Sequence, residues 1–448
     1  MNFHSPNFNR RQFVKKSTKA IAVASLAPTI SFAGADTIRK KLRLVLVGTG
    51  SRGSSCWGKQ LVGPYTDYVE MVGLCDINHK RVEVAKELIG TKAKTYHSRD
   101  FDRMINEQKP DMVIVTTTDS FHVDYIVRAM ELGCDVVSEK PIATEADQCQ
   151  RILDAEKQTG KKVFVGFNVR YMDESTEMKR IISSGELGKI ISIDYQEYLD
   201  TSHGASYFRR WHGKVKYSGS LLVHKSSHHF DLINWLLDAD PVEVQATGKT
   251  AFYGSNGKIR GKNCRNCQHT ASCSFYWDMT KDKKSMQMYG DCEDVDQYYR
   301  DGCVWDNEID SHDTSSVQVQ YDNGTQLTYT LNAFLPYEGQ RISFTGEKGR
   351  LDVRLYYRQP WEVEAPFEFR LTKNREETKI WTMKPSEGGH GGADERVKDM
   401  LFKPDQEDPT GQSAGSRAGV MSSIIGIAAR KSVETKQVVK ISDLIKFQ

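Results

Sequence analysis

The chain has 448 residues, of which 38% are hydrophobic and 27% charged, and its formal net charge is +3. At about 100–200 residues per domain, this length predicts two or three domains with buried cores and excludes a mainly disordered chain. The longest weakly polar stretch, 20–35, is shorter than the roughly 18 apolar residues of a membrane-spanning helix, so no span is expected. Because no long basic run follows the first twenty residues, nucleic acid is not an expected partner either.

Residues 1–35 have the composition of an export signal. Basic residues without any acid precede an apolar stretch over 20–33, and the small-residue sequence Ala-Gly-Ala follows at 33–35. The pair Arg10 and Arg11 lies in a sequence that resembles the twin-arginine export signal. We therefore expect export to the periplasm or an equivalent compartment, with an amphipathic or disordered tail as the alternative. Removing the segment's five basic residues would turn the net charge of +3 into −2.

Residues 36–165 are predicted to form a doubly wound α/β domain that binds a dinucleotide. An apolar strand over 42–47 leads into the glycine motif GTGSRG, and a second strand over 71–75 leads into Asp76. The glycines allow a pyrophosphate to approach the backbone at a helix N-terminus, while the carboxylate hydrogen-bonds the adenosine ribose. The residues expected at the cofactor are Gly48, Gly50, Ser51, Arg52, Gly53 and Asp76. Asp76 favours NAD, because its charge would repel a 2′-phosphate, but nearby arginines leave NADP open.

The alternation of strands and helices continues to the end of this domain. Strands are predicted over 112–115, 135–137 and 163–165, and a helix over 122–132. Ligands of such parallel sheets bind at the carboxyl ends of the strands. The side chains expected at this edge are those of Thr118, His122, Glu139 and Lys140.

Four short sequences carry a family resemblance. They are the glycine motif, Glu139-Lys140-Pro141 after the fifth strand, GFNVRY over 166–171 and GELGK over 185–189. Together they resemble the glucose-fructose oxidoreductase, inositol dehydrogenase and MocA family. The resemblance implies a Rossmann domain followed, over 166–448, by an α/β domain whose open, mainly antiparallel sheet often mediates homo-oligomers. It also implies hydride transfer between a nicotinamide and a sugar, polyol or related secondary alcohol.

Lys140 is the predicted catalytic cation. Pro141 biases the residue before it toward extended backbone, which keeps Lys140 at the strand end instead of starting a helix. There its ammonium can polarise a substrate oxygen while a hydride is transferred. The alternative is an ordinary surface lysine.

A second catalytic segment is predicted over 220–237, whose apolar spacing is that of a helix. On one continuous helix, His224, His228 and Asp231 would lie along one face, where a polar stripe is costly unless it lines a site or is fully hydrogen-bonded. The family resemblance implies an aspartate and, four residues later, a histidine. His228 matches the histidine, and His224 stands where the aspartate is expected.

We therefore predict that His228 takes or gives the hydroxyl proton. His224 can contact substrate, but it brings no negative charge to hold Lys140. A zinc site that uses both histidines, with Asp231 or Glu139 as a third ligand, is one alternative. Core histidines satisfied by backbone groups are another.

Residues 206–212 (SYFRRWH) combine arginines with aromatic rings, which suits both a carbohydrate pocket and a packing cluster between domains. The predicted substrate contacts are Arg170, Tyr207, Arg209, Arg210, Trp211 and His212. A glycine-rich loop over 388–394 precedes a helix that Asp394 is expected to cap. His390 either reaches a ligand from this loop or belongs to a simple turn.

Five of the nine cysteines fall in a polar insertion over 260–305. Cys264, Cys267 and Cys273 have the spacing of a structural metal site. In an oxidising compartment the same residues could instead form disulfides. Metal ligands, disulfides and free thiols therefore remain as alternatives, and catalysis by these cysteines is not expected.

The remaining sequence predicts the second sheet. Alternating strands over 315–321 and 326–331 flank an Asp-Asn-Gly turn and indicate an antiparallel hairpin. Strands over 341–344 and 350–353 extend the sheet, and a helix of small residues over 419–433 is expected to pack against it.

The sequence as a whole predicts an NAD(P)-dependent oxidoreductase acting on a sugar, glycoside or cyclitol. Because a diffusible nicotinamide pool is not expected outside the cytoplasm, the cofactor should be held tightly and regenerated within the site. One alternative is an NAD-dependent glycoside hydrolase that works by transient oxidation and elimination. Another is a sugar-binding relative that retains the dinucleotide for structure only.

Overall fold

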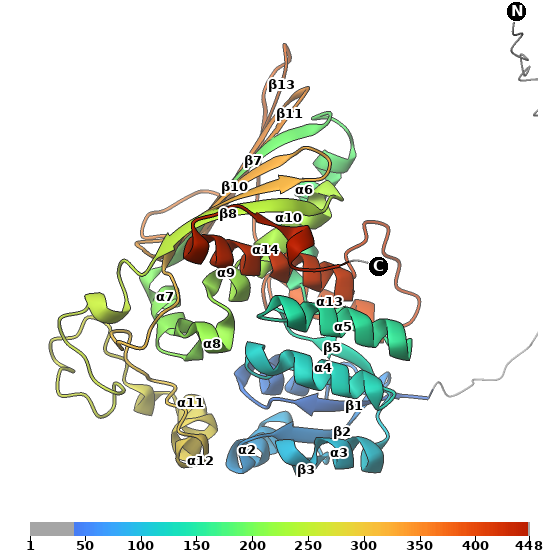
Figure 1. Cartoon of the computed structure of the whole chain (residues 1–448), viewed down its shortest axis with the longest axis vertical. Helices are drawn as coiled ribbons and strands as arrows, with labels where there is room; N and C mark the ends of the chain where they lie inside the picture. Colours follow the sequence, from blue (N-terminus) through green and yellow to red (C-terminus); the bar gives the residue numbers. More distant parts are fainter. Residues whose placement is uncertain (1–39, 447–448) are drawn as a thin grey trace, which may run out of the picture. The chain divides into compact units, whose positions relative to one another are not determined.

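Two β-sheets organise the chain in the computed structural model, which describes residues 40–446 (Figure 1). The predicted export signal over 1–35 lies outside these residues. Within the described part of the chain, no helix is long and apolar enough to cross a membrane.

The first sheet contains six strands of the described chain, all parallel, in the order β3-β2-β1-β4-β5-β6. They are β1 (Leu42–Val47), β2 (Val69–Asp76), β3 (Lys94–His97), β4 (Met112–Val115), β5 (Asp135–Ser138) and β6 (Val163–Val165). The order reverses between β1 and β4, the position where doubly wound sheets bind ligands at their carboxyl edge. The predicted Rossmann fold is confirmed.

Helices cover both faces of this sheet, which is why β1 is apolar almost throughout. They are α2 (His79–Ile89), α3 (Phe101–Gln108), α4 (His122–Glu131), α5 (Ala146–Thr159), the π-helical segment η1 (Gly53–Lys59) and, from far along the chain, α13 (Ala393–Phe402). Val45 and Val47 of β1 share a core with α3, α4 and α5, whereas Leu44 and Leu46 share one with η1, α2 and α13.

Close backbone contacts explain why Gly48 and Gly53 must be glycine. Gly48 has a φ of +89° between β1 and η1, and a Cβ there would lie 2.6 Å from the carbonyl carbon of Thr116. A Cβ on Gly53 would lie 2.2 Å from the oxygen of Gly48. The glycines thus allow strand, loop and helix to pack as a dinucleotide-binding turn requires.

The second sheet contains nine strands of the described chain, in the order β14-β13-β12-β11-β7-β10-β9-β8-β15. They are β7 (Ile190–Asp200), β8 (Pro241–Lys249), β9 (Thr314–Tyr321), β10 (Gln326–Leu335), β11 (Glu338–Gly346), β12 (Gly349–Arg358), β13 (Phe367–Lys373), β14 (Lys379–Met383) and β15 (Val439–Lys440). Neighbours are antiparallel except β7 and β10. This confirms the mainly antiparallel sheet, including the β9–β10 hairpin.

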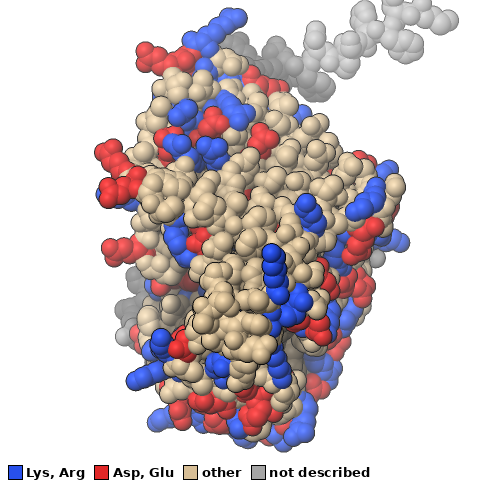
Figure 2. All heavy atoms as spheres, turned by 90° about the vertical axis from the view of Figure 1, so that its left-hand side faces the viewer, with Lys and Arg blue, Asp and Glu red and all other residues tan. Residues whose placement is uncertain are grey.

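The other helices after β6 are α6 (Asp173–Ser183), α7 (Thr201–Phe208), α8 (Val215–Ser218), α9 (Leu221–His224), α10 (Ser227–Leu237), α11 (Lys283–Met288), α12 (Glu293–Asp296) and α14 (Ser416–Thr435). Helix α14 packs against β8 and α10 on one side and against α5 on the other, joining the two halves of the chain (Figure 1). On the side where α11 and α12 lie, acidic and basic side chains are interspersed (Figure 2).

The predicted continuous helix over 220–237 is wrong. The segment forms two helices, because α9 ends at His224 and α10 begins at Ser227. In an unbroken helix the His228 N–H would donate to the His224 carbonyl, but here it donates to the Lys225 carbonyl. Asp231 stays on α10 together with His228, and its buried carboxylate binds Arg170.

We predict that Gly426→Ala destabilises the protein by about 1–3 kcal/mol, because a Cβ at this position of α14 would lie 2.3 Å from the Leu222 carbonyl oxygen. Urea denaturation followed by circular dichroism measures the loss. Gly63→Ala is the matched control, since a Cβ there meets nothing within 4 Å. Equal stability of the two variants would contradict the close packing of α14 on α9.

Candidate active site

A cavity of about 1430 Å³ opens at the carboxyl edge of the first sheet. Its wall includes the glycine loop, the ends of β2, β4 and β5, the segment from α7 to α10, and part of the insertion. The predicted site residues that line it are Gly48, Gly50, Ser51, Arg52, Asp76, Thr118, His122, Glu139, Lys140, Tyr207, Arg209, Arg210, Trp211, His212, His224 and His228. Gly53 and Arg170 do not line the cavity.

The end of the cavity beside β1 and β2 fits a dinucleotide. The Asp76 carboxylate is held by the N–H of Thr49 at 2.7 Å, the Thr49 hydroxyl at 2.8 Å and the N–H of Asn78 at 2.9 Å. It is therefore fixed at the position where a ribose binds in this fold. Gly50 leaves the loop backbone open toward the cavity, because the nearest atom to a Cβ there would be the Tyr289 hydroxyl at 3.4 Å.

Lys140 extends from the end of β5 into the cavity. Its Nζ donates to the His224 carbonyl at 3.0 Å and lies 3.5 Å from Nε2 of the same residue. The carbonyl accepts this bond because the helix break has released it from His228. Burial lowers the pKa of Lys140 to about 8, although the charges of Asp119 and Glu139 oppose the shift.

Asp119 forms a buried pair with His224 that the sequence did not predict. The Asp119 Oδ2 lies 2.5 Å from His224 Nδ1. If Nδ1–H donates to Asp119, Nε2 is left to accept from Lys140, and the three groups form one hydrogen-bonded chain. Burial holds the pKa of His224 well below its usual value and raises that of Asp119, while the Lys140 charge favours the ionised carboxylate.

His224 itself brings no negative charge to Lys140, but Asp119 behind it does. Asp119 follows β4 in the sequence TTTD, so its position at the carboxyl edge was visible. Its partner was not, because His224 is 105 residues away in the chain.

His228 also faces the cavity, from the first turn of α10. Its ring packs edge-on against Phe167, with 6.0 Å between the ring centres. Within the described residues, its buried Nδ1 has no hydrogen-bond partner. Burial and the nearby Lys140 charge hold its pKa well below the usual value, so the ring is neutral and has an unused nitrogen.

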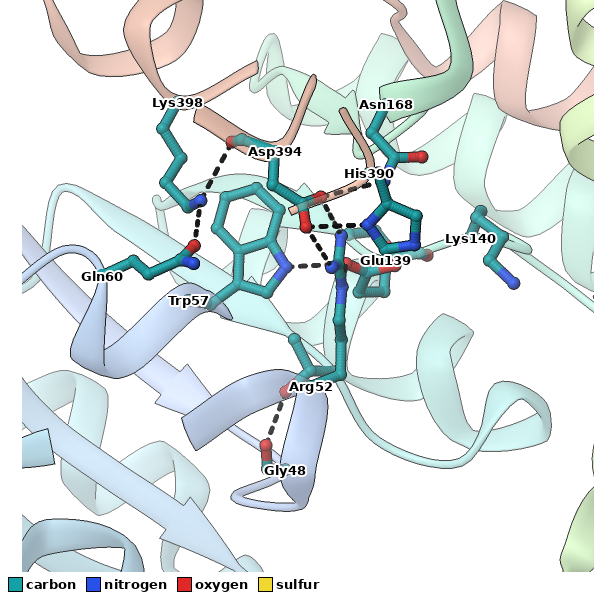
Figure 3. Close-up of polar contacts among 12 residues, drawn as sticks. Gly48, Arg52, Trp57, Gln60, Glu139, Lys140, Asn168, His390, Asp394 and Lys398 are labelled. Carbon is teal, nitrogen blue, oxygen red and sulfur yellow. Dashed lines mark hydrogen bonds and ion pairs between the residues drawn. The ribbon is translucent and has the colours of Figure 1, made fainter. Parts of the chain in front are cut away.

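Arg52, Glu139 and Asp394 form an ion-pair cluster behind Lys140 (Figure 3). Glu139 accepts from Arg52 Nε at 2.5 Å and from Trp57 Nε1 at 2.7 Å. Asp394 binds the other end of the Arg52 guanidinium at 2.9 and 3.0 Å. The Lys140 ammonium points away from this cluster. The side chains of Arg52 and Glu139 therefore fix the turn from which Lys140 extends.

The prediction that Asp394 caps a helix is wrong. Helix α13 begins at Ala393, and Gly392 occupies its cap position. The Asp394 carboxylate instead accepts from Asn168 at 2.8 Å and lies 2.9 Å from His390 Nδ1. Although burial opposes the shift, His390 and Arg52 hold the pKa of Asp394 well below the ordinary value.

The predicted substrate segment surrounds His224 with aromatic rings. Ring centres lie 5.4 Å from His224 for Tyr207, 5.5 Å for Trp211 and 4.3 Å for His212. Arg210 donates to Ser206, and burial lowers its pKa to about 10. The Arg209 guanidinium turns to the Cys264 sulfur at 3.0 Å.

Two other predicted residues, Arg170 and His122, are held by structural contacts. Arg170 is buried and bound by both oxygens of Asp231, at 2.6 and 2.7 Å. It therefore holds α10 to the segment after β6. The His122 ring lines the cavity but lies 2.8 Å from the Pro141 carbonyl and 3.1 Å from that of Thr117.

The cysteines of the insertion are free thiols in the structure. Cys264, Cys267, Cys273 and Cys303 line a small pocket beside Arg209. Within residues 40–446, no group of three metal-binding side chains is arranged to hold an ion. The metal and disulfide interpretations therefore find no support in the described chain.

Two family models match this chain. One, the NAD-binding Rossmann fold of an oxidoreductase family, matches residues 42–167, and the other, the family's C-terminal alpha/beta domain, matches residues 179–441. The chain belongs to the Gfo/Idh/MocA oxidoreductase family. Its first domain is thus an NAD-binding domain, in agreement with the glycine loop and Asp76.

Known proteins are similar to this chain over different lengths. YteT of Bacillus subtilis (strain 168) is 35% identical over 427 residues, 90% of this chain and 99% of YteT. Inositol 2-dehydrogenase of Salmonella paratyphi B is 32% identical over 173 residues, 38% of this chain and 48% of that enzyme.

Solved structures share the fold at lower identity. The WlbA dehydrogenase from Bordetella pertussis, in complex with NADH and UDP-GlcNAcA, has a TM-score of 0.61 and 20% identity, covering 90% of this chain and 99% of that one. Aldose-aldose oxidoreductase from Caulobacter crescentus, complexed with glycerol, has a TM-score of 0.60 and 15% identity, covering 90% and 100%.

We predict that Asp119→Asn lowers the pKa of Lys140 by about one pH unit or more, because the carboxylate stabilises the ammonium form. The neutral amine would then appear at a lower pH than in the wild type, where the pKa is about 8. Competitive acetylation of Lys140 across a pH series, read by mass spectrometry, measures the midpoint. Asp124→Asn is the control, since this side chain is exposed on α4. An unchanged or raised midpoint in Asp119→Asn would contradict the coupling.

Proposed function

We propose that this family member transfers a hydride between tightly held NAD and a secondary alcohol of a sugar, glycoside or cyclitol. The proposal is carried by the hydrogen-bonded chain from Lys140 through His224 to Asp119, which shares one cavity with the glycine loop. A polarising cation, a neutral histidine with an unused nitrogen, and a nucleotide site are the groups that alcohol oxidation requires.

The residues divide the work as follows. Bound NAD supplies the acceptor for a hydride from the substrate carbon. Lys140 donates a hydrogen bond to the alcohol oxygen and orients it, and His228 accepts the hydroxyl proton. His224 and Asp119 position Lys140 and balance its charge.

The cavity wall supports a hydroxyl-rich substrate. Tyr207 and Trp211 offer ring faces and edges for sugar C–H groups, and Arg210 offers N–H donors. Among relatives, inositol dehydrogenases and an aldose-aldose oxidoreductase act on cyclitols and sugars, as their names state. We propose the same broad class for this chain.

We further propose that the protein is exported to the periplasm or an equivalent compartment and forms a homo-oligomer. Export is supported by the basic and apolar composition of residues 1–35. Oligomerisation through the second sheet is supported by the strands β9 and β10, in which every second side chain is exposed or partly exposed. Outside the cytoplasm, a cofactor that stays bound would be regenerated by a second carbonyl substrate.

The test is to purify the protein, record the absorbance of bound nicotinamide, and add a panel of sugars, cyclitols and aryl glycosides. Reduction of the nicotinamide without release of aglycone supports the proposal. Release of aglycone without net reduction would instead identify a glycoside hydrolase. If neither reduction nor aglycone release occurs, and Lys140→Met changes no measured property, catalysis is contradicted. The protein would then be a sugar-binding protein.

We expect Lys140→Met and His228→Asn each to lower kcat at least about 100-fold, the usual cost of losing an acid–base group. Binding of NAD should largely remain, since the glycine loop and Asp76 still provide their contacts with the dinucleotide. Lys92→Met, on an exposed lysine, provides the control. Steady-state kinetics on the best substrate of the panel measure the effect, and a loss below tenfold in both variants would disprove the assignment.

A further inference from the structure

The insertion over 260–305 lies against the nucleotide-binding edge of the first domain. In Figure 1, α11 and α12 lie beside α2, and polar contacts join the insertion to α2, to Asn78 before it and to η1. These are Asn78 to the Cys292 carbonyl at 2.8 Å, Arg81 to the Met288 carbonyl at 3.3 Å, Lys80 to Asp294 at 2.7 Å, Arg81 to Asp296 at 2.7 Å, and Lys284 to Ser55 at 2.7 Å. The insertion therefore packs next to the glycine loop and Asp76, where a dinucleotide is expected to bind.

Tyr289 of the insertion reaches the glycine loop itself. Its hydroxyl accepts the N–H of Ser51 at 2.7 Å. In a Rossmann domain, the N–H groups of this loop, at the start of the helix, bind the pyrophosphate. Tyr289 is buried and also lines the cavity, so its hydroxyl stands at the edge of the phosphate site.

Arg300 lies above Tyr289, with the guanidinium carbon 5.2 Å from the ring centre. Its Nε is buried and has no hydrogen-bond partner within the described residues. Arg210 lines the same cavity, and the Arg300 charge helps to lower its pKa. Two guanidinium groups that line one cavity and feel each other's charge favour an anion near them.

We propose that the insertion forms part of the dinucleotide site, in which Tyr289 and Arg300 bind the pyrophosphate from the side opposite the glycine loop. The proposal rests on the NAD-binding function of the family. A phosphate oxygen is a charged and therefore stronger acceptor than a phenol. With the dinucleotide bound, the Ser51 N–H would donate to the phosphate oxygen instead of to Tyr289. The Tyr289 hydroxyl would then donate to the phosphate.

A second link between the insertion and the first domain is the ion pair between Arg81 and Asp296, near the expected ribose position. Arg81 lies 3.5 Å from Asp76, whose carboxylate marks the ribose position. An NAD molecule would thus be enclosed by the glycine loop on one side and by the insertion on the other. Release requires the insertion to separate from the loop, which gives a physical basis for a cofactor that stays bound.

The experiment measures NADH dissociation from the full-length protein by fluorescence, with excess NAD as the displacing ligand. We expect Tyr289→Phe and Arg300→Gln each to release NADH at least about tenfold faster, the effect of losing one hydrogen bond to a charged group. Tyr276→Phe is the matched control, because this tyrosine is in the same insertion but 41% exposed. Thermal unfolding of each variant verifies that the insertion remains folded.

Dissociation within twofold of the wild-type rate in both variants would overturn the proposal. Slower dissociation from Tyr289→Phe would also overturn it, since the hydroxyl would then compete with the phosphate for Ser51. The measurement contains no sugar, so it separates the two proposals. Wild-type protein that binds NADH but oxidises no substrate would contradict the proposed reaction alone.

Discussion

The partly buried ammonium of Lys140 is the constraint on which the site depends. A cation removed from water is costly unless hydrogen bonds and an opposite charge compensate it. The His224 carbonyl and ring supply the hydrogen bonds, and Asp119 supplies the charge. These groups come from the ends of β5 and α9 and from the turn after β4, so the packing of both halves of the chain holds the site together.

Adjacent residues at the end of β5 have opposite tasks. Glu139 points back into the ion-pair cluster with Arg52 and Asp394, whereas Lys140 points into the cavity (Figure 3). Because Asp394 belongs to α13, a helix from the end of the chain fixes a turn of the first domain. The break between α9 and α10 serves the same end, since it frees the carbonyl that Lys140 binds.

Local patterns predicted most of the fold and part of the site. The glycine motif, the strand ends and the Lys-Pro element are each encoded within a few residues. Strand patterns predicted part of both sheets, but not β3, β7, β8, β13, β14 or β15. Asp119 with His224, and Ser51 with Tyr289, are joined only by tertiary contacts across 105 and 238 residues. Arg170 was predicted to contact substrate, but it pairs with Asp231, 61 residues further along the chain. The helix break had one signal in the sequence, the polar run of lysine and two serines before His228.

The central claim is that Asp119 supplies the carboxylate which Lys140 needs, in place of the aspartate that the family resemblance implies at position 224. The most direct measurement compares Asp119→Asn with the double variant Asp119→Asn/His224→Asp, using the rate of nicotinamide reduction by the best substrate. We expect the double variant to react at least about tenfold faster than Asp119→Asn, because the new aspartate returns a negative charge beside the ammonium of Lys140. A double variant no faster than Asp119→Asn would contradict the account.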